Sequence, residues 1–401
     1  MKYTLFLLCL HLLFSLGVSA KKKAKTVSFR YYGSTWFVRF PDNLHIQWND
    51  TSTVSLADEL GKESYIQDII EATDECMRLK QEKRLNDWAY LNMLDSLTIT
   101  RYGRGNEATL VKSSIFINSG YKMRLARDNN YQLYMLFSST HYIYGLSYFT
   151  IDGEWYYIHG NFNIKTAHII NSNPKDKRQV SLDMKEPPLL DYKPTVSKTW
   201  ETGKALHLSI CEKVTPLKLS VKLNQNLLDF YAQYPSSMKN YDFMTRWAMM
   251  ANIALDGNLK QQIYPNLKEQ LKGLSQKDAV QSILTFMHTA FEYADDEDIW
   301  GYDRAFYSEE TLFYSKSDVE DRVILMSRFV RDLLDLPVIL MFFPGHLALG
   351  IHFDEEVEGA NIIYNGDRFV FCDAVYLGSS IGQLMSLYAD EDPERIILLY
   401  K

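Results

Sequence analysis

Cysteine is scarce in this sequence, with four residues among 401. Cys9 lies in the apolar N-terminal segment, which leaves Cys76, Cys211 and Cys372 for the rest of the chain. A set this sparse and odd in number excludes a framework of disulfides, although one bridge, such as Cys76 to Cys211, is compatible with an oxidising compartment. No Cys-x-x-Cys pair is present, so the sequence does not predict a structural zinc site.

Positive charge is not in excess, because 43 lysines and arginines stand against 50 aspartates and glutamates, for a net charge of −7. Such a chain is not expected to bind nucleic acid, since it has no surplus of cations to neutralise phosphates. The aromatic content of 14% and the hydrophobic content of 46% exclude a disordered or collagen-like protein. The length predicts two or three domains.

Long apolar runs are confined to residues 1–20. Lys2 precedes an apolar stretch, and Val18-Ser19-Ala20 has the small residues of a cleavage site. The stretch is shorter than the ~20 residues that span a bilayer, so the pattern predicts a secretory signal peptide that is cut after Ala20. We expect an exported protein, located in the periplasm, at the cell surface or outside the cell, with no membrane span after cleavage.

Helical and strand patterns follow one another without regular alternation, which predicts an α+β fold. Residues 21–185 are expected to form an N-terminal α+β domain that begins with a hairpin around Tyr32-Gly33. Residues 186–235, rich in proline at their start, are predicted as a linker and β segment. Residues 236–401 are expected to form the second domain.

Three motifs resemble binding sites without completing them. The segment Gly103–Ala108 matches a dinucleotide-binding pattern but lacks an acidic residue about 20 positions later, so a loop before a helix is expected. The run Asp295–Asp298 lacks the later ligands of a calcium loop and is expected to be a solvated acidic loop. His346 and His352 share a strand face without a third ligand, so neither a metal nor a cofactor is predicted.

The segment from Ser317 to Asp373 carries the most informative pattern. Ser317-Asp318-Val319-Glu320 matches a capping box with Ser317 as the N-cap, and it opens a helix that is expected to end before the next proline. An apolar strand follows, then a strand that begins at His346, and later a strand that ends at Asp373. Cys372 is adjacent to Asp373 and is therefore expected to point to the opposite face of the sheet.

A helix N-terminus, a strand with histidine and a neighbouring strand with aspartate form the layout of a papain-like Cys-His-Asp site. In such a site the helix dipole and an imidazolium stabilise a thiolate. The histidine transfers protons, and the aspartate orients the imidazole ring. His346 and Asp373 are the candidates for these two roles.

Five segments extend this pattern over roughly residues 240–401. They are Glu309–Tyr314, Ser317–Arg322, Phe329–Leu336, Pro344–Ala348 and Cys372–Gly378. In this order they resemble the core of the transglutaminase-like superfamily, especially the long secreted members found in Bacteroidetes. The resemblance implies a papain-like core, with a helix packed on an antiparallel sheet, and amide chemistry at a cysteine.

The departure from the family concerns the nucleophile. The family's cysteine falls on Val319, and valine can neither attack a carbonyl group nor hold a thiolate. The resemblance therefore implies a pseudoenzyme, in which Val319 begins the apolar stripe of the helix and His346 is bonded to Asp373 without acting as a base. Neither Cys372, on the opposite face, nor Ser317, as a helix cap, is expected to replace the cysteine.

In the N-terminal half, the segment from Gly105 to Leu125 and the tyrosine-rich strands after it follow the helix–strand order of residues 317–373. This order suggests that the N-terminal half is a second, more degenerate copy of the same unit. The leading hypothesis is an exported, catalytically inactive protein whose retained groove binds a peptide, a protein or a glycoconjugate of the cell envelope. Two alternatives remain. One is an amide hydrolase or transferase in which His346 and Asp373 activate water, and the other is a structural component of the envelope.

Overall fold

The computed structural model describes residues 24–46, 48, 53–160, 162, 164, 167–171, 174–203, 214–388 and 391–400. The predicted signal peptide and Cys211 lie outside these residues. The chain forms two compact units. Unit 1 comprises residues up to Asp183 together with 188–191 and 235–240, and unit 2 comprises the remainder. The segment predicted as a linker and β segment, 186–235, contains two strands and, beyond that prediction, a helix, all of which belong to unit 2.

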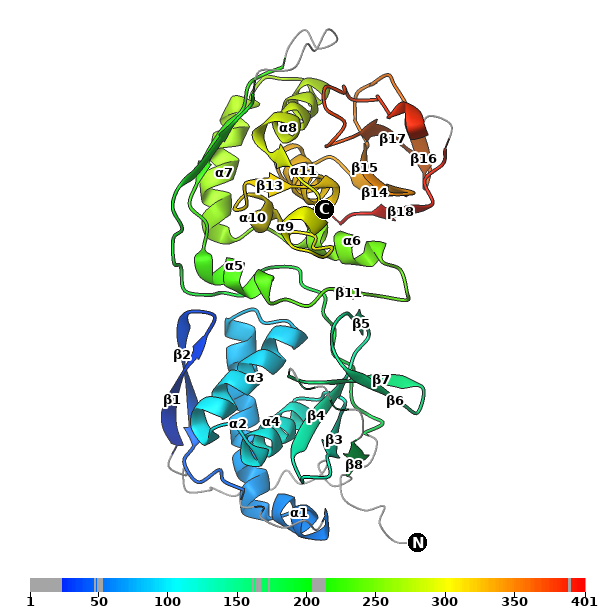
Figure 1. The fold of residues 1–401 in the computed structure, drawn as a ribbon. Coiled ribbons are helices and arrows are strands. Elements are labelled where there is room, and N and C mark those ends of the chain that lie inside the picture. The colour runs from blue at the N-terminus through cyan, green and yellow to red at the C-terminus, as the bar shows by residue number, and fades with distance from the viewer. Residues whose placement is uncertain are drawn as a thin grey trace. The chain divides into compact units, whose positions relative to one another are not determined.

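Unit 1 is built from helices and antiparallel strands (Figure 1). Its helices are α1 (Thr53–Leu60), α2 (Glu63–Glu82), α3 (Asp87–Tyr102) and α4 (Asn106–Asn118). Its strands are β1 (Ala24–Tyr31), β2 (Ser34–Pro41), β3 (Met123–Arg127), β4 (Leu133–Ser138), β5 (Tyr142–Ile143), β6 (Tyr148–Ile151), β7 (Glu154–Ile158), β8 (His168–Ile169) and β11 (Ser237–Met238). The main sheet has the strand order β6-β7-β4-β3-β8, and every neighbouring pair is antiparallel.

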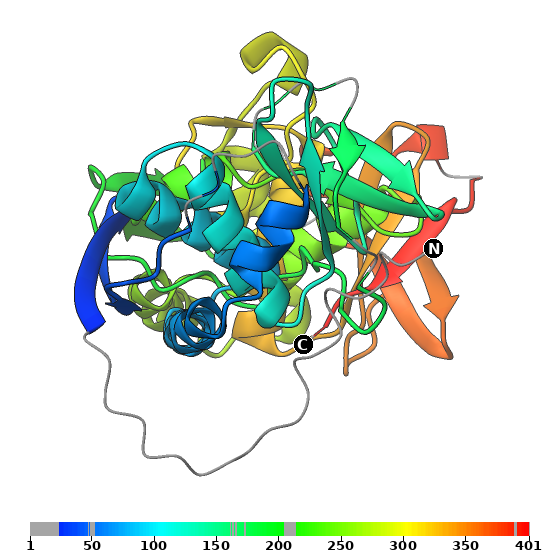
Figure 2. The ribbon, with the colours of Figure 1, turned by 90° about the horizontal axis from the view of Figure 1, so that it is seen from below.

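The predicted N-terminal hairpin is confirmed. Strands β1 and β2 pair in antiparallel register, and the two turn residues Tyr32 and Gly33 both have positive φ, of 42° and 74°. These values fit a two-residue turn whose twist matches that of the strands. Both views show the hairpin beside the helices of unit 1 (Figures 1 and 2), where β1 packs on α3 and β2 on α2.

Unit 2 is also a mixture of helices and antiparallel strands. Its helices are α5 (Gln225–Ala232), α6 (Met244–Asn252), α7 (Gly257–Gln270), α8 (Gln276–Ala290), α9 (Asp296–Ile299), α10 (Ser308–Thr311), α11 (Val319–Leu334) and the 3₁₀ helix η1 (Ser386–Tyr388). Its strands are β9 (Lys198–Glu201), β10 (Lys218–Val221), β12 (Glu292–Tyr293), β13 (Lys316–Ser317), β14 (Val338–Phe343), β15 (His346–Ile351), β16 (Asn361–Tyr364), β17 (Asp367–Cys372) and β18 (Arg395–Leu398). The main sheet has the order β16-β17-β15-β14-β18. The α+β class predicted from the sequence is confirmed.

Helix α11 is the central helix of unit 2, and it packs on β14 and β15 as well as on α6 and α8. Its predicted stripe is buried, since Val323, Met326 and Val330 are all inaccessible to solvent. The helix ends where Asp335 takes the left-handed conformation, with φ of 59°. Figure 1 shows the helices of unit 2 gathered on one side of this sheet. The predicted helix–strand–strand order from residue 319 to residue 351 is therefore present.

The two units share a strand plan. The sheet of unit 1 has the order β6-β7-β4-β3-β8 and that of unit 2 has β16-β17-β15-β14-β18, so the strands correspond one to one. The hairpins also agree in detail, because both β6–β7 and β16–β17 close around two residues of positive φ, Asp152-Gly153 and Asn365-Gly366. The same plan is what a second copy of the unit in the N-terminal half would give, and the duplication stays a prediction.

Among the described residues, none of the helices combines the length and the apolar character that crossing a membrane requires.

Candidate functional site

The connections of unit 2 bring the three predicted site residues to one end of its sheet. Helix α11 begins at Val319 and, after a short loop, leads into β14, which packs on it and runs back along it. Strand β14 therefore ends, and β15 begins at His346, near the N-terminus of α11. Strand β17 is antiparallel to β15, so its end, and Asp373 immediately after it, lies beside the start of β15.

The histidine and the aspartate form a buried pair. His346 Nε2 lies 2.8 Å from Asp373 Oδ2, and the two residues are 5% and 1% exposed. Because a carboxylate only accepts hydrogen bonds, Nε2 carries the proton in this contact. The other carboxylate oxygen, Oδ1, accepts bonds from the backbone N–H groups of Val375 and Tyr376, at 3.1 and 3.0 Å. Asp373 is thus held from both sides and fixes the orientation of the imidazole ring.

A second histidine reaches the same aspartate from α8. His288 Nε2 lies 2.8 Å from the backbone oxygen of Asp373, and the ring is 6% exposed. Burial lowers the pKa of His288, so the neutral ring donates this bond. The sequence offered no signal for this contact, since residues 288 and 373 are far apart along the chain. His288 holds the backbone of Asp373 in place.

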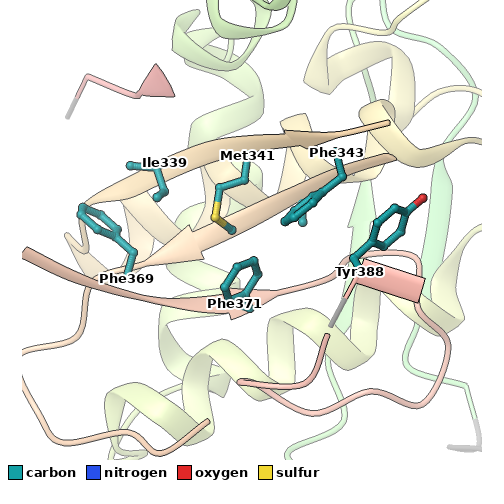
Figure 3. Packing of buried hydrophobic residues seen from close by; sticks show 7 residues of the cluster. Ile339, Met341, Phe343, Phe369, Phe371 and Tyr388 are labelled. Atoms are coloured by element: carbon teal, nitrogen blue, oxygen red, sulfur yellow. The ribbon is translucent and has the colours of Figure 1, made fainter. Parts of the chain in front are cut away.

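An aromatic cluster continues from the histidine along one face of the sheet (Figure 3). It includes Phe343 of β14, Phe371 of β17 and Tyr388 of η1. The rings of Tyr388 and His346 are parallel to within 7°, with centroids 5.2 Å apart. Phe342, which points to the other face, contacts the aromatic rings of α6 instead. The imidazole of His346 is therefore covered by a tyrosine, which the sequence did not predict.

The N-terminus of α11 differs from its prediction. The N-cap is Asp318 and not Ser317, because Asp318 Oδ1 accepts the N–H of Asp321 while Asp321 Oδ2 accepts the N–H of Asp318. Asp321 is fixed in this role by the backbone N–H of Phe306, which donates to its other oxygen at 2.7 Å. Val319 follows as the first helical residue and is only half-buried, so it lies at the margin of the apolar stripe.

Carboxylates gather around this helix N-terminus. Asp296, Asp318 and Asp321 form one group and Asp296, Asp303 and Glu320 another, and in each group the residues offer oxygens within 4.8 Å of one another. Burial, with repulsion from neighbouring carboxylates, raises the pKa values of Asp318, Glu320 and Asp321. Oxygen ligands in this arrangement could hold a divalent cation or share protons.

This cluster corrects one prediction. The run Asp295–Asp298 was expected to be solvated, but Asp296 is 6% exposed and accepts the backbone N–H of Arg304 at 2.5 Å. No sequence pattern indicates that this run meets the start of α11, since only the fold brings the two segments together.

The cysteines do not supply a substitute nucleophile among the described residues. Cys76 is a free and fully buried thiol of α2, and Cys211, the bridge partner that the sequence allowed it, lies outside the described residues. Cys372 is also free and fully buried, and it ends β17 next to Asp373. Burial raises the pKa of both thiols, which keeps them protonated and unreactive.

The shared strand plan identifies the corresponding place in unit 1. The pairs Leu136–Ile158 and Gly350–Phe371 align the two sheets, so that Gln132 corresponds to His346 and Gly160 to Asp373. Gln132 Nε2 donates to Oδ1 of Asn106, the first residue of α4, at 3.0 Å. In unit 1, therefore, the residue just before β4 reaches the N-terminus of α4. At this position unit 1 has the side-chain amides of Gln132 and Asn106.

Unit 1 has a different polar centre between its helices and its sheet. Lys112 Nζ donates to Asp95 Oδ1 at 2.5 Å and lies 3.1 Å from His159 Nδ1. Burial, followed by the nearby ammonium, lowers the pKa of His159 to about 3, so its ring is neutral. Its Nε2 bonds to Asn92 Oδ1 at 3.0 Å. This network is an internally satisfied ion pair and offers no group to a ligand.

No protein-family model, curated protein or solved structure matches this chain.

Proposed function

We propose that this chain is an exported protein of the transglutaminase-like type that has lost its nucleophile and binds a peptide, a protein or a glycoconjugate of the cell envelope at the end of the sheet where Val319, His346 and Asp373 gather. The observation that carries the proposal is the His346–Asp373 bond of 2.8 Å in a buried setting. A carboxylate held by two backbone N–H groups, with an oriented imidazole, is the support that a papain-like nucleophile requires.

The position of Val319 supports the same proposal. It is the first residue of α11, where backbone N–H groups point outward and the helix dipole favours a negative charge. In unit 1, the side chain of Gln132, just before β4, bonds to the first residue of α4, and we infer a similar approach at the corresponding end of unit 2. A cysteine at position 319 would meet the helix dipole and the imidazole, which lower a thiol pKa, and also the neighbouring carboxylates of Asp318 and Glu320, which oppose that lowering; valine responds to none of them.

The test restores a thiol at position 319. In a Cys211→Ser background, Val319→Cys is alkylated with iodoacetamide over a range of pH, and the variant Val319→Cys/His346→Ala is the matched control. The thiol is expected to titrate below its ordinary ~8.5, and the shift is expected to shrink in the control. The buried Cys76 and Cys372 contribute little to the signal. A thiol that titrates at or above ~8.5 in both variants would refute the proposed site.

The same variant tests the chemistry and the loss of function. Val319→Cys is expected to gain release of ammonia from glutamine-containing peptides, because amides are the substrates that the resemblance implies, while the natural chain shows none. Binding of an envelope partner by the natural chain should fall on His346→Ala and survive Ser317→Ala, which alters a nearby residue that does not cap the helix.

The hydrogen-bonded pair also keeps a second candidate function open. An imidazole whose Nε2 is bonded to a carboxylate has the geometry of a general base, and Nδ1 could accept a proton from water. In that case the natural chain hydrolyses amides without a thiol. Amide turnover by the natural chain that disappears on His346→Ala would replace the first proposal with this one.

A further inference from the structure

The imidazole of His346 is closed off by a short segment of the connection between β17 and β18, and both of these strands belong to the main sheet. The segment comprises residues 383–388, which end in η1 (Figure 3). Tyr388 stacks on His346 and also lies 5.2 Å from the ring of Phe343, measured between centroids. Its phenol donates to the backbone oxygen of Pro344 at 3.3 Å. Tyr388 is 7% exposed, whereas Leu387 beside it is 71% exposed.

One attachment to the sheet lies just before this segment. Gly382 donates its N–H to the backbone oxygen of Phe371 and accepts the N–H of Ala360, both at 2.8 Å. Its φ is 79°, and a Cβ atom there would lie 2.7 Å from the backbone oxygen of Glu358 and the Cα atom of Gly359. Only glycine fits such a position. Gly382 therefore fixes the segment to the sheet and is a conformationally permissive point from which the segment leaves it.

Beyond Gly382 the attachment is weak. Among the described residues, the hydrogen bonds made by residues 383–388 are local to the segment and its flanks, except for the one from the Tyr388 phenol to Pro344. The side chains of Leu384 and Met385 pack on the aromatic cluster and are only partly buried. A stretch held by a few apolar contacts and one hydrogen bond belongs to the least stable parts of a fold.

We propose that residues 383–388 form a cover over the His346–Asp373 pair, with Tyr388 as the latch, and that a ligand gains access to His346 when this loop lifts from the sheet between its attachments at Gly382 and β18. The proposal rests on the function proposed above, because it assigns regulation to the same site. Closure removes both the face of the imidazole and the phenol from solvent. Opening exposes His346 together with Phe343 and the carbonyl of Pro344, which an incoming aromatic group and donor could use in place of Tyr388.

The test measures the accessibility of the imidazole. Diethyl pyrocarbonate modifies accessible imidazole nitrogens, and mass spectrometry of peptides gives the rate at each histidine. Tyr388→Ala is expected to raise the rate at His346 by about tenfold, because the ring stack and the hydrogen bond are both lost. Tyr388→Phe keeps the stack and is expected to raise it only about twofold. His288, buried through α8, is the internal control and should not change.

A rate at His346 that does not rise in Tyr388→Ala, or that rises equally at His288, would overturn the proposal. Hydrogen exchange of the natural chain gives a second test that needs no variant. The amides of residues 384–388 are expected to exchange at least about a hundredfold faster than those of Phe371 and Gly382. Equal protection would also overturn the cover. Neither test uses a ligand or a change at position 319. Failure of the cover proposal can therefore be distinguished from failure of the proposed function.

Discussion

Replacing the buried carboxylate of Glu309 is expected to change the pH dependence of stability in a defined direction. Glu309 is 3% exposed, and its Oε1 accepts the backbone N–H of Asp256 at 2.9 Å. Burial raises its pKa from the ordinary 4.5 to about 7. The native state therefore holds this proton between about pH 4.5 and 7, where the unfolded chain has released it. The contribution of Glu309 is greatest below pH 4.5 and is lost as the pH rises to 7.

The magnitude follows from the pKa. One pKa unit corresponds to ~1.4 kcal/mol, so a rise from 4.5 to about 7 corresponds to ~3 kcal/mol of stability lost on going from acid to neutral pH. Glu309→Gln keeps the acceptor for Asp256 and cannot ionise. We expect the free energy of unfolding of Glu309→Gln to be nearly the same as that of the natural chain at pH 4.5 and higher by ~3 kcal/mol at pH 8.

The assay is urea unfolding followed by circular dichroism at both pH values, with equal slopes checked between variants. Glu310→Gln is the matched control, because burial raises its pKa to about 7 as well, but its carboxylate pairs with Arg304 at 2.6 Å. Losing that pair leaves a buried guanidinium without its partner, so this variant should not be stabilised at pH 8. An effect of Glu309→Gln that is the same at both pH values would refute the reasoning.

Three further substitutions test the packing and the charges. Gly350→Ala should lower the stability of unit 2 by about 1–3 kcal/mol in urea unfolding, because its Cβ would lie 2.7 Å from Ile339 Cγ1; an unchanged midpoint would contradict this contact. Lys112→Met should lower the free energy of unfolding by about 2 kcal/mol. This loss is smaller than for breaking a fully buried ion pair, because a third of the Asp95 side chain is exposed and water solvates its carboxylate; a stabilised variant would contradict the ion pair. Asp296→Asn should raise the thermal midpoint at pH 8 more than at pH 5, since it removes repulsion within the carboxylate cluster, and calorimetry at the two pH values checks this.

Helix α11 and strands β14, β15 and β17 of unit 2 followed from the sequence, because they depend on local patterns. The spacing of apolar residues from Val323 to Val330 gave the helix, and the alternation after His346 gave the strand. His346 at the start of β15 and Asp373 after the end of β17 could be expected to meet, since these two strands are antiparallel neighbours in the sheet and such pairing brings those ends together. The α+β class followed for the same reason.

The tertiary structure decided what depends on segments far apart in the chain. It selected Asp318 over Ser317 as the cap, because the backbone of Phe306 holds Asp321 in the capping position. It brought Asp296 to the start of α11, where this one carboxylate of a run expected to be solvated is buried.

It also stacked Tyr388 on the histidine and buried Cys76 as a free thiol. A sequence pattern records the period of each element and the conformation of each turn. Which carboxylates share a site, and which ring covers an imidazole, depends on how distant elements pack, and local periodicity carries no information about that packing.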